Sequence, residues 1–192
     1  MAAIAVLSSI SVAAGGDING KIVAWAGPAP HRHLAVVWLA GMQPQTPPRS
    51  QPVMAQHGGQ FVPDFLVVVA GQTVSMPNED EVAHNVYSSS EAKQFNLGFY
   101  AKGDPKTVTF DRPGLVDVRC LLHQAMRAEI LVVPTPYYAR VAPDGSFHIR
   151  NVPGGAFSLS FWGDGMASFE QGITVPSDGK PISVSLALPG SP

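Results

Sequence analysis

The sequence predicts an all-β protein of the sandwich type, and three observations support this fold class. Short runs rich in β-branched and aromatic residues recur along the 192-residue chain, separated by Gly, Pro or Asp-Gly turns. The 19 glycines and 18 prolines interrupt the sequence so often that long helices have little room. With 45% apolar and 14% charged residues, the composition is that of a globular protein rather than a disordered one.

Ten segments are predicted as strands from their β-rich composition and the turn residues between them. They are residues 21–25, 34–39, 65–69, 73–76, 107–110, 116–120, 128–133, 146–149, 157–161 and 182–186. Only residues 88–95 leave room for a helical turn.

The charge pattern excludes some classes of function. The net charge is −2, and no run of Lys and Arg interleaves with aromatic residues, so we expect no nucleic-acid partner. No pair of carboxylates has a spacing that suggests acid–base catalysis. A cysteine hydrolase would need an oxyanion hole, of which the sequence shows no sign. We therefore expect a protein that is not an enzyme.

Residues 1–14 are small and apolar. They are too few to span a bilayer as a helix, and they are typical of the hydrophobic core of a secretory signal, although the basic residues that usually precede it are missing. A truncated signal segment and a periplasmic or otherwise exported protein are expected, without a transmembrane span. The alternative is an apolar N-terminal strand.

Two proline-rich stretches indicate domain boundaries. Residues 43–52 contain four prolines and little to bury, so they are predicted to be a linker. A second boundary is predicted at residues 133–136. A domain over residues 50–134 would then hold every candidate metal ligand.

That central segment contains the only cysteine of the chain, Cys120, followed by His123 and Met126. A thiolate, an imidazole and a thioether within seven residues can face one point if the backbone loops around it, and His84 is the best candidate for a second imidazole. One Cys, two His and a weak Met are the ligands of a blue copper site. Zinc fits less well, because a thioether is a poor ligand for it. An inert buried thiol is the remaining alternative.

The segments that flank this loop are predicted to form a rigid frame. Residues 116–120 alternate as a strand does, which places Cys120 at a strand end, and residues 128–133 resume a strand. Of the other histidines, His31 and His33 are interpreted as exposed residues at a strand start, His57 as a loop residue, and His148 as facing away from the core. The acidic residues 78–81 are interpreted as a solvated loop, with steering of a basic redox partner as the alternative.

The same segment resembles the cupredoxins, and its short Cys-x2-His-x2-Met loop is most like that of amicyanin. Over residues 55–165 the chain resembles more closely a group of bacterial cupredoxin-domain proteins often labelled methylamine-utilisation proteins. The shared motifs are Phe61-Val62-Pro63, residues 69–74, 77–80, 84–88 and 93–100, and the loop from Cys120 to Met126.

The resemblance implies a cupredoxin Greek-key β-sandwich with one type 1 copper site, whose Cu(II)/Cu(I) ligands are His84, Cys120, His123 and Met126. It implies that Asn85 ties the two ligand loops together by hydrogen bonding. It also implies that a partner docks around His123, on Leu121, Leu122, Gln124 and Ala125. Gln124 stands where the family often has proline.

Residues 137–188, with Asp144-Gly145 as a hairpin turn, resemble the later strands of a small transthyretin-like, carboxypeptidase-regulatory-like β-sandwich. Its opening strands are expected before the proline-rich linker. Residues 17–45 and 136–188 would then form one split sandwich into which the cupredoxin domain is inserted. The alternative is a single cupredoxin with extra strands at both ends.

The expected function is that of an exported blue copper protein that carries single electrons between redox partners, such as a c-type cytochrome or a periplasmic oxidoreductase. A copper-binding or copper-delivery protein without an electron-transfer role is the alternative. A structural module of a larger cell-surface assembly is a third hypothesis. The sequence does not indicate the oligomeric state.

Overall fold

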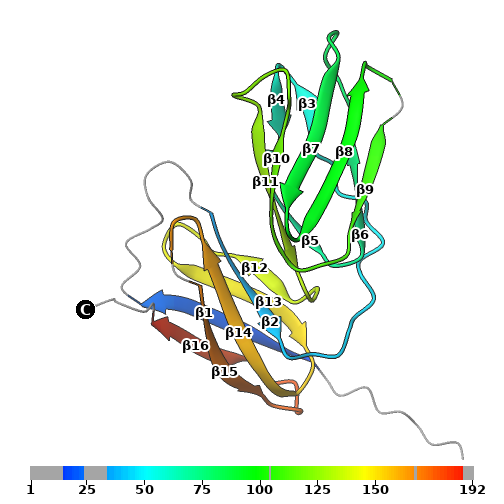
Figure 1. Ribbon diagram of the computed structural model, residues 1–192. Helices are drawn as coiled ribbons and strands as arrows, with labels where there is room; N and C mark the ends of the chain where they lie inside the picture. Colours follow the sequence, from blue (N-terminus) through cyan, green and yellow to red (C-terminus); the bar gives the residue numbers. More distant parts are fainter. Residues whose placement is uncertain (1–14, 24–33, 104, 167, 188–192) are drawn as a thin grey trace, which may run out of the picture. The chain divides into compact units, whose positions relative to one another are not determined.

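The computed structural model describes residues 15–23, 34–103, 105–166 and 168–187 (Figure 1). Within these ranges the regular structure consists of 16 β-strands and no helix, which confirms the all-β prediction. The helical turn expected over residues 88–95 is wrong, because these residues lie in a β-hairpin. The predicted signal segment 1–14 and the pair His31 and His33 lie outside the described residues.

The chain divides into two compact units, Met1–Val37 with Ala139–Pro192 and Trp38–Tyr138. That residues 50–134 form an inserted, independently folding domain remains a prediction. In the part of the chain that the structure describes, no helix is long and apolar enough to cross a membrane.

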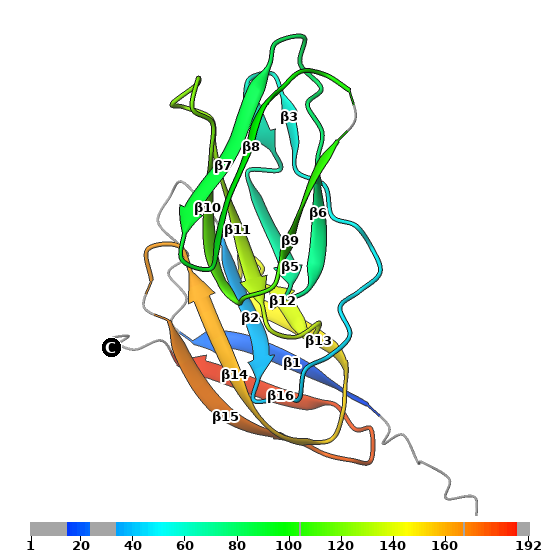
Figure 2. The ribbon, with the colours of Figure 1, turned by 45° about the vertical axis from the view of Figure 1, so that its right-hand side comes forward.

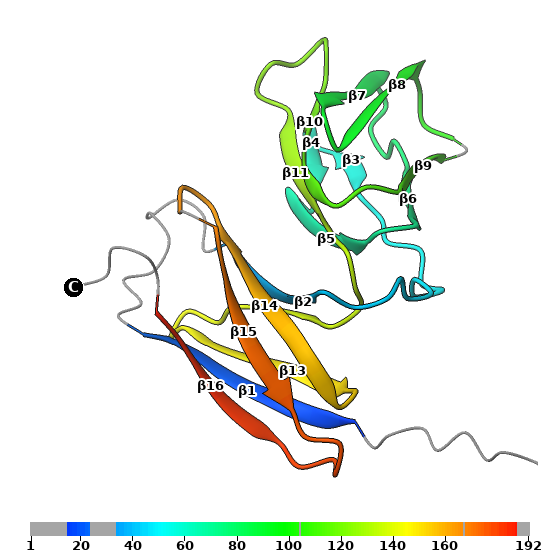
Figure 3. The same ribbon diagram turned by 60° about the horizontal axis from the view of Figure 1, so that its bottom comes forward.

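The Trp38–Tyr138 unit is a β-sandwich. Its largest sheet has the strand order β5-β11-β10-β7-β8, and two smaller sheets pair β6 with β9 and β3 with β4. Figures 1 to 3 all show β6 and β9 on the side of this unit opposite β10 and β11. The strands are β3 (Ala55–His57), β4 (Gln60–Val62), β5 (Phe65–Val69), β6 (Gln72–Met76), β7 (His84–Ser90), β8 (Lys93–Tyr100), β9 (Lys106–Phe110), β10 (Gly114–Arg119) and β11 (Arg127–Val133).

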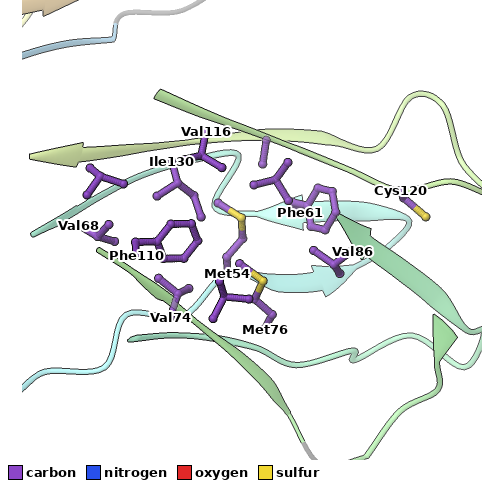
Figure 4. Packing of buried hydrophobic residues seen from close by; sticks show 14 of the residues in the cluster. Met54, Phe61, Val68, Val74, Met76, Val86, Phe110, Val116, Cys120 and Ile130 are labelled. Atoms are coloured by element: carbon purple, nitrogen blue, oxygen red, sulfur yellow. The ribbon is translucent and has the colours of Figure 1, made fainter. Parts of the chain in front are cut away.

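The core of this unit lies between its sheets. Alternate residues of the large sheet, such as Val116 and Ile130, pack with Val74, Met76 and Phe110 of the sheet formed by β6 and β9 (Figure 4). All five side chains are completely buried. Cys120 lies at one end of this cluster in Figure 4, so the thiol is built into the end of the hydrophobic core.

The remaining strands form two sheets, one with the order β13-β1-β16 and one with the order β12-β2-β14-β15. They belong to the other unit, except that β2 and β12 run across its boundaries. Strand β1 pairs with β13 in antiparallel and with β16 in parallel orientation. The strands are β1 (Gly16–Val23), β2 (Ala35–Ala40), β12 (Tyr138–Arg140), β13 (Ser146–Val152), β14 (Gly155–Gly163), β15 (Phe169–Val175) and β16 (Ile182–Ala187). Buried Ile18, Ile149 and Phe161 belong to the core of this unit.

The proline-rich segment 43–52 forms no strand, as expected of a linker, but its second half is fastened to the Trp38–Tyr138 unit. Buried Gln72 donates from Nε2 to the carbonyl oxygens of Pro48 and Ser50, at 3.5 and 3.1 Å, while its Oε1 accepts from the backbone of Val69. Ser75 N donates to Pro52 O at 2.9 Å. The segment is therefore held along β6 rather than left as a free tether.

Ten predicted strands are found, with differences of one to three residues at most ends, and residues 24–25 of the first lie outside the described ranges. Six were missed: β3, β4, β7, β8, β12 and β15. Strand β7 ends in three serines, and β8 mixes Lys, Gln, Asn and Gly with its aromatic residues, with exposed and half-buried residues alternating only as far as Gly98. Their pairing with the large sheet therefore decides their conformation.

The separate cores predict that a cavity in one unit weakens that unit alone. Phe110→Ala and Phe161→Ala each remove a completely buried ring, which should lower the free energy of unfolding of the unit concerned by about 3–5 kcal/mol. Native-state amide hydrogen exchange on the full chain measures this unit by unit. Equal loss of protection in both units for either variant would show one cooperative domain.

Candidate metal centre

The loop between β10 and β11 is closed at its base by the strand pair. These strands pair in antiparallel fashion as far as Arg119 opposite Arg127, and Cys120 N then donates to Met126 O at 3.3 Å. Met126 N donates to His123 O at 2.9 Å, which folds the loop back on itself. The predicted frame of two strands joined by a short loop is confirmed.

Burial differs sharply along this loop. Cys120 and Met126, which lie at its two ends, are 4% and 1% exposed, whereas the five residues between them, including His123, are exposed. Both sulfur side chains therefore face the protein interior, and His123 lies at its surface.

His84 comes from a different part of the sequence. It is the first residue of β7, is completely buried, and lies next to the loop because β7 pairs with β10 through Tyr87 and Arg119. His84 Nδ1 lies 3.2 Å from His123 Nδ1, and Cys120 Sγ lies 3.8 Å from His123 Nδ1. The three ligand atoms lie within 4.8 Å of one another.

Two of the three separations are close to those around a single metal ion, and the third, between Cys120 and His84, is within 4.8 Å. Bonds of about 2.0 Å to imidazole nitrogen and about 2.3 Å to thiolate, as in zinc sites, place two nitrogens about 3.5 Å apart and sulfur and nitrogen about 3.7 Å apart when the three donors surround the ion in a plane. The nitrogen pair is 3.2 Å apart and the nearer sulfur–nitrogen pair is 3.8 Å apart. The donor set of one thiolate and two imidazoles suits a borderline or soft transition metal.

Met126 ends the same loop and is buried in the cluster that contains Cys120. A thioether is a soft, weak donor, which zinc does not favour and copper accepts as an axial ligand. The residues present therefore fit copper better than zinc. The ligand role of all four side chains remains a prediction.

The structure reveals an acidic residue near the site that sequence reasoning missed. Asp80 Oδ2 lies 2.8 Å from His84 Nε2, on the side of the ring opposite the other ligands. The side chain of Asp80 is 15% exposed, whereas that of Glu81 is 86% exposed. The interpretation of residues 78–81 as a solvated loop therefore holds for Glu79 and Glu81 and is wrong for Asp80 and for Asn78, which is buried. The only sequence signal was an aspartate four residues before the histidine.

Asn85 is 1% exposed, and its Nδ2 donates to Asn96 Oδ1 on the neighbouring strand β8, at 2.8 Å. Its Oδ1 is buried without a partner among the described residues. The predicted tie between Asn85 and the loop of Cys120 therefore remains a prediction.

The residues predicted for partner docking surround His123 on the exposed part of the loop. Leu121 and Leu122 are 53% and 56% exposed, and Gln124 and Ala125 are exposed as well. Large apolar side chains at this level of exposure are candidates for a contact surface.

Two other histidines lie away from the site. His57 is exposed and lies 3.3 Å from Glu79, and His148 is exposed and lies 2.9 Å from Asp17. Both positions confirm that these residues lie at the surface, but His57 is the last residue of β3 and not a loop residue.

No protein-family profile matches the chain, and no curated protein does. Similar solved structures include a purple cupredoxin from Nitrosopumilus maritimus, 23% identical over 43% of this chain and 100% of that one, with a TM-score of 0.39. A reduced amicyanin variant is 20% identical over 50% of this chain and 98% of that one, at 0.41. An oxidised amicyanin variant is 23% identical over 44% and 84%, also at 0.41. Each likeness covers half of this chain or less.

The geometry predicts binding of one metal ion per chain. Replacing a ligand should weaken Zn²⁺ affinity by more than the roughly 10- to 100-fold typical of losing an outer hydrogen-bond partner. His84→Ala is the test and His57→Ala the matched control, and competition with a chromophoric chelator gives both affinities. Equal affinities for the two variants would place the metal elsewhere.

Proposed function

We propose that this chain is a cupredoxin-type protein that binds one copper ion and carries single electrons. The observation that carries the proposal is the convergence of Cys120 Sγ, His84 Nδ1 and His123 Nδ1 within 4.8 Å, beside the buried Met126. Copper held by such a set cycles between Cu(II) and Cu(I) without making or breaking a bond in a substrate.

The protein residues supply a fixed, dry surrounding for that chemistry. Cys120 and Met126 are anchored by the ends of β10 and β11, and His84 by β7, so three of the four side chains belong to the interior of one sandwich. A donor set held in place before the metal binds needs little rearrangement when the charge of the site changes. This property suits an electron carrier.

His123 is the proposed route for electrons, because it is the exposed member of the set. The apolar side chains of Leu121, Leu122 and Ala125, with Gln124, form the proposed docking surface around it. A small contact of this kind allows quick association and release. We infer a redox protein as partner, such as a c-type cytochrome or a periplasmic oxidoreductase, and periplasmic or other export in keeping with the apolar residues 1–14.

A copper-delivery role is the second candidate, and the exposure of residues 121–125 favours it, since an incoming ligand could reach His123. We further propose that Trp38–Tyr138 has the cupredoxin fold in the manner of the methylamine-utilisation group. The other unit would be a carboxypeptidase-regulatory-like sandwich split by that insertion.

The type of copper site can be read from colour. Cu(II)-loaded protein should show an intense visible band from thiolate-to-copper charge transfer and a narrow copper hyperfine splitting in its spin-resonance spectrum. Cys120→Ala should abolish both, while Met126→Leu should keep the band and raise the reduction potential, because loss of a weak donor favours Cu(I). A colourless Cu(II) adduct of the intact protein would contradict the proposed blue copper site.

The docking surface can be tested with a charge. Ala125→Glu should leave the visible spectrum nearly unchanged but slow electron exchange with a test cytochrome c, measured by stopped flow. The double variant Glu79→Gln with Glu81→Gln removes exposed charges and should change mainly the salt dependence of the rate. Equal rates for wild type and Ala125→Glu at every ionic strength would show that electrons leave elsewhere.

A further inference from the structure

The carboxylate of Asp80 accepts three hydrogen bonds at once. Gly58 N donates to Oδ1 at 2.7 Å, Gly59 N donates to Oδ2 at 2.9 Å, and His84 Nε2 lies 2.8 Å from Oδ2. The backbone N–H of Asp80 is held in turn by Asn78 Oδ1 at 2.9 Å. The carboxylate and the backbone N–H of Asp80 are therefore both held by hydrogen bonds.

The two glycine donors form the turn of the β3–β4 hairpin. His57 pairs with Gln60, so Gly58 and Gly59 are the two turn residues, and their φ angles of 62° and 69° lie in the left-handed region. A two-residue turn with both φ angles positive is the type I′ hairpin, for which glycine is suited. This turn directs two N–H groups at one carboxylate.

The hydrogen-bond geometry shows which way the contact with His84 runs. Each oxygen of Asp80 already accepts a backbone N–H, one from Gly58 and one from Gly59, so this side chain acts as an acceptor carboxylate. A carboxylate only accepts hydrogen bonds, so His84 Nε2 must carry the proton in this contact. In the neutral imidazole, Nδ1 then bears the lone pair, and Nδ1 is the atom that faces His123.

We propose that Asp80 is a positioning residue of the metal centre, which holds His84 in the orientation and tautomer that present Nδ1 to the metal. A carboxylate on the outer nitrogen of a metal-binding histidine fixes the ring and raises its basicity. The inference rests on the proposed metal site. It adds that the β3–β4 turn, which contributes no ligand, prepares the site through Asp80.

Two neighbours of Asp80 in the sequence serve as matched controls. Glu79 pairs with His57 and Glu81 pairs with Lys102, and their side chains are 52% and 86% exposed. Glu79→Gln and Glu81→Gln change the net charge as Asp80→Asn does, but they leave the contact with His84 intact. A purely electrostatic effect of removing one negative charge would appear in all three variants.

The test has two readouts. The first is the tautomer of His84 in the metal-free protein, read from its imidazole nitrogen chemical shifts by NMR. Wild type and both glutamine variants should carry the proton on Nε2, and Asp80→Asn should shift it toward Nδ1. The second is Zn²⁺ affinity, which should fall about 10- to 100-fold in Asp80→Asn and stay unchanged in the controls.

The two readouts separate this inference from the proposed function. An Nδ1-protonated His84 in the metal-free wild type would overturn the role of Asp80, and this result does not depend on whether any variant folds. So would an equal loss of Zn²⁺ affinity in Asp80→Asn, Glu79→Gln and Glu81→Gln. Absence of the blue band from copper-loaded wild type with Nε2-protonated His84 would instead contradict the copper proposal alone.

Discussion

The proposed metal centre depends on the antiparallel ladder between β10 and β11. This ladder runs without interruption from Gly114 opposite Val132 to Arg119 opposite Arg127, and the next residues on either side are Cys120 and Met126. The ends of the ligand loop are therefore fixed by sheet hydrogen bonds and by core packing. A thiol and a thioether that would otherwise search many conformations are held beside each other before a metal binds, which reduces the entropy lost on binding.

The remaining donors differ in how firmly they are held. His84 is completely buried, starts a strand that pairs with β10, and is fixed at its outer nitrogen by Asp80. His123 lies in the exposed part of the loop and has its Nδ1 near both His84 and Cys120. The site is thus rigid on its inner side and accessible at one ligand. An electron carrier would use the accessible His123 to pass electrons, and a delivery protein would use it to pass the metal to an incoming ligand.

The position of the loop between β10 and β11 could be predicted from the sequence, because strand alternation marks both of its sides. The proposed ligands Cys120, His123 and Met126 were recognisable there because they are close in the chain. The contact of Asp80 with Gly58 and Gly59 joins residues more than twenty positions apart and leaves no periodic pattern. Strands β7 and β8 were not predicted, because β7 is mostly polar, β8 mixes polar and aromatic residues, and pairing with neighbouring strands decides their conformation. The contact of the proline-rich segment with Gln72 could not be predicted either, because it depends on a single buried glutamine more than twenty residues away in the chain.

Electron exchange and metal exchange separate the two functions most directly. Oxidised and reduced copper-loaded protein can be mixed in the presence of a competing thiol ligand. The rate of electron self-exchange is measured by NMR line broadening, and the rate of copper loss is measured by transfer of copper to the thiol ligand. If the buried donors hold the metal as proposed, electrons should exchange between molecules while the copper stays bound. Copper that passes to the competitor as fast as electrons exchange, or faster, would contradict the account and indicate a delivery protein.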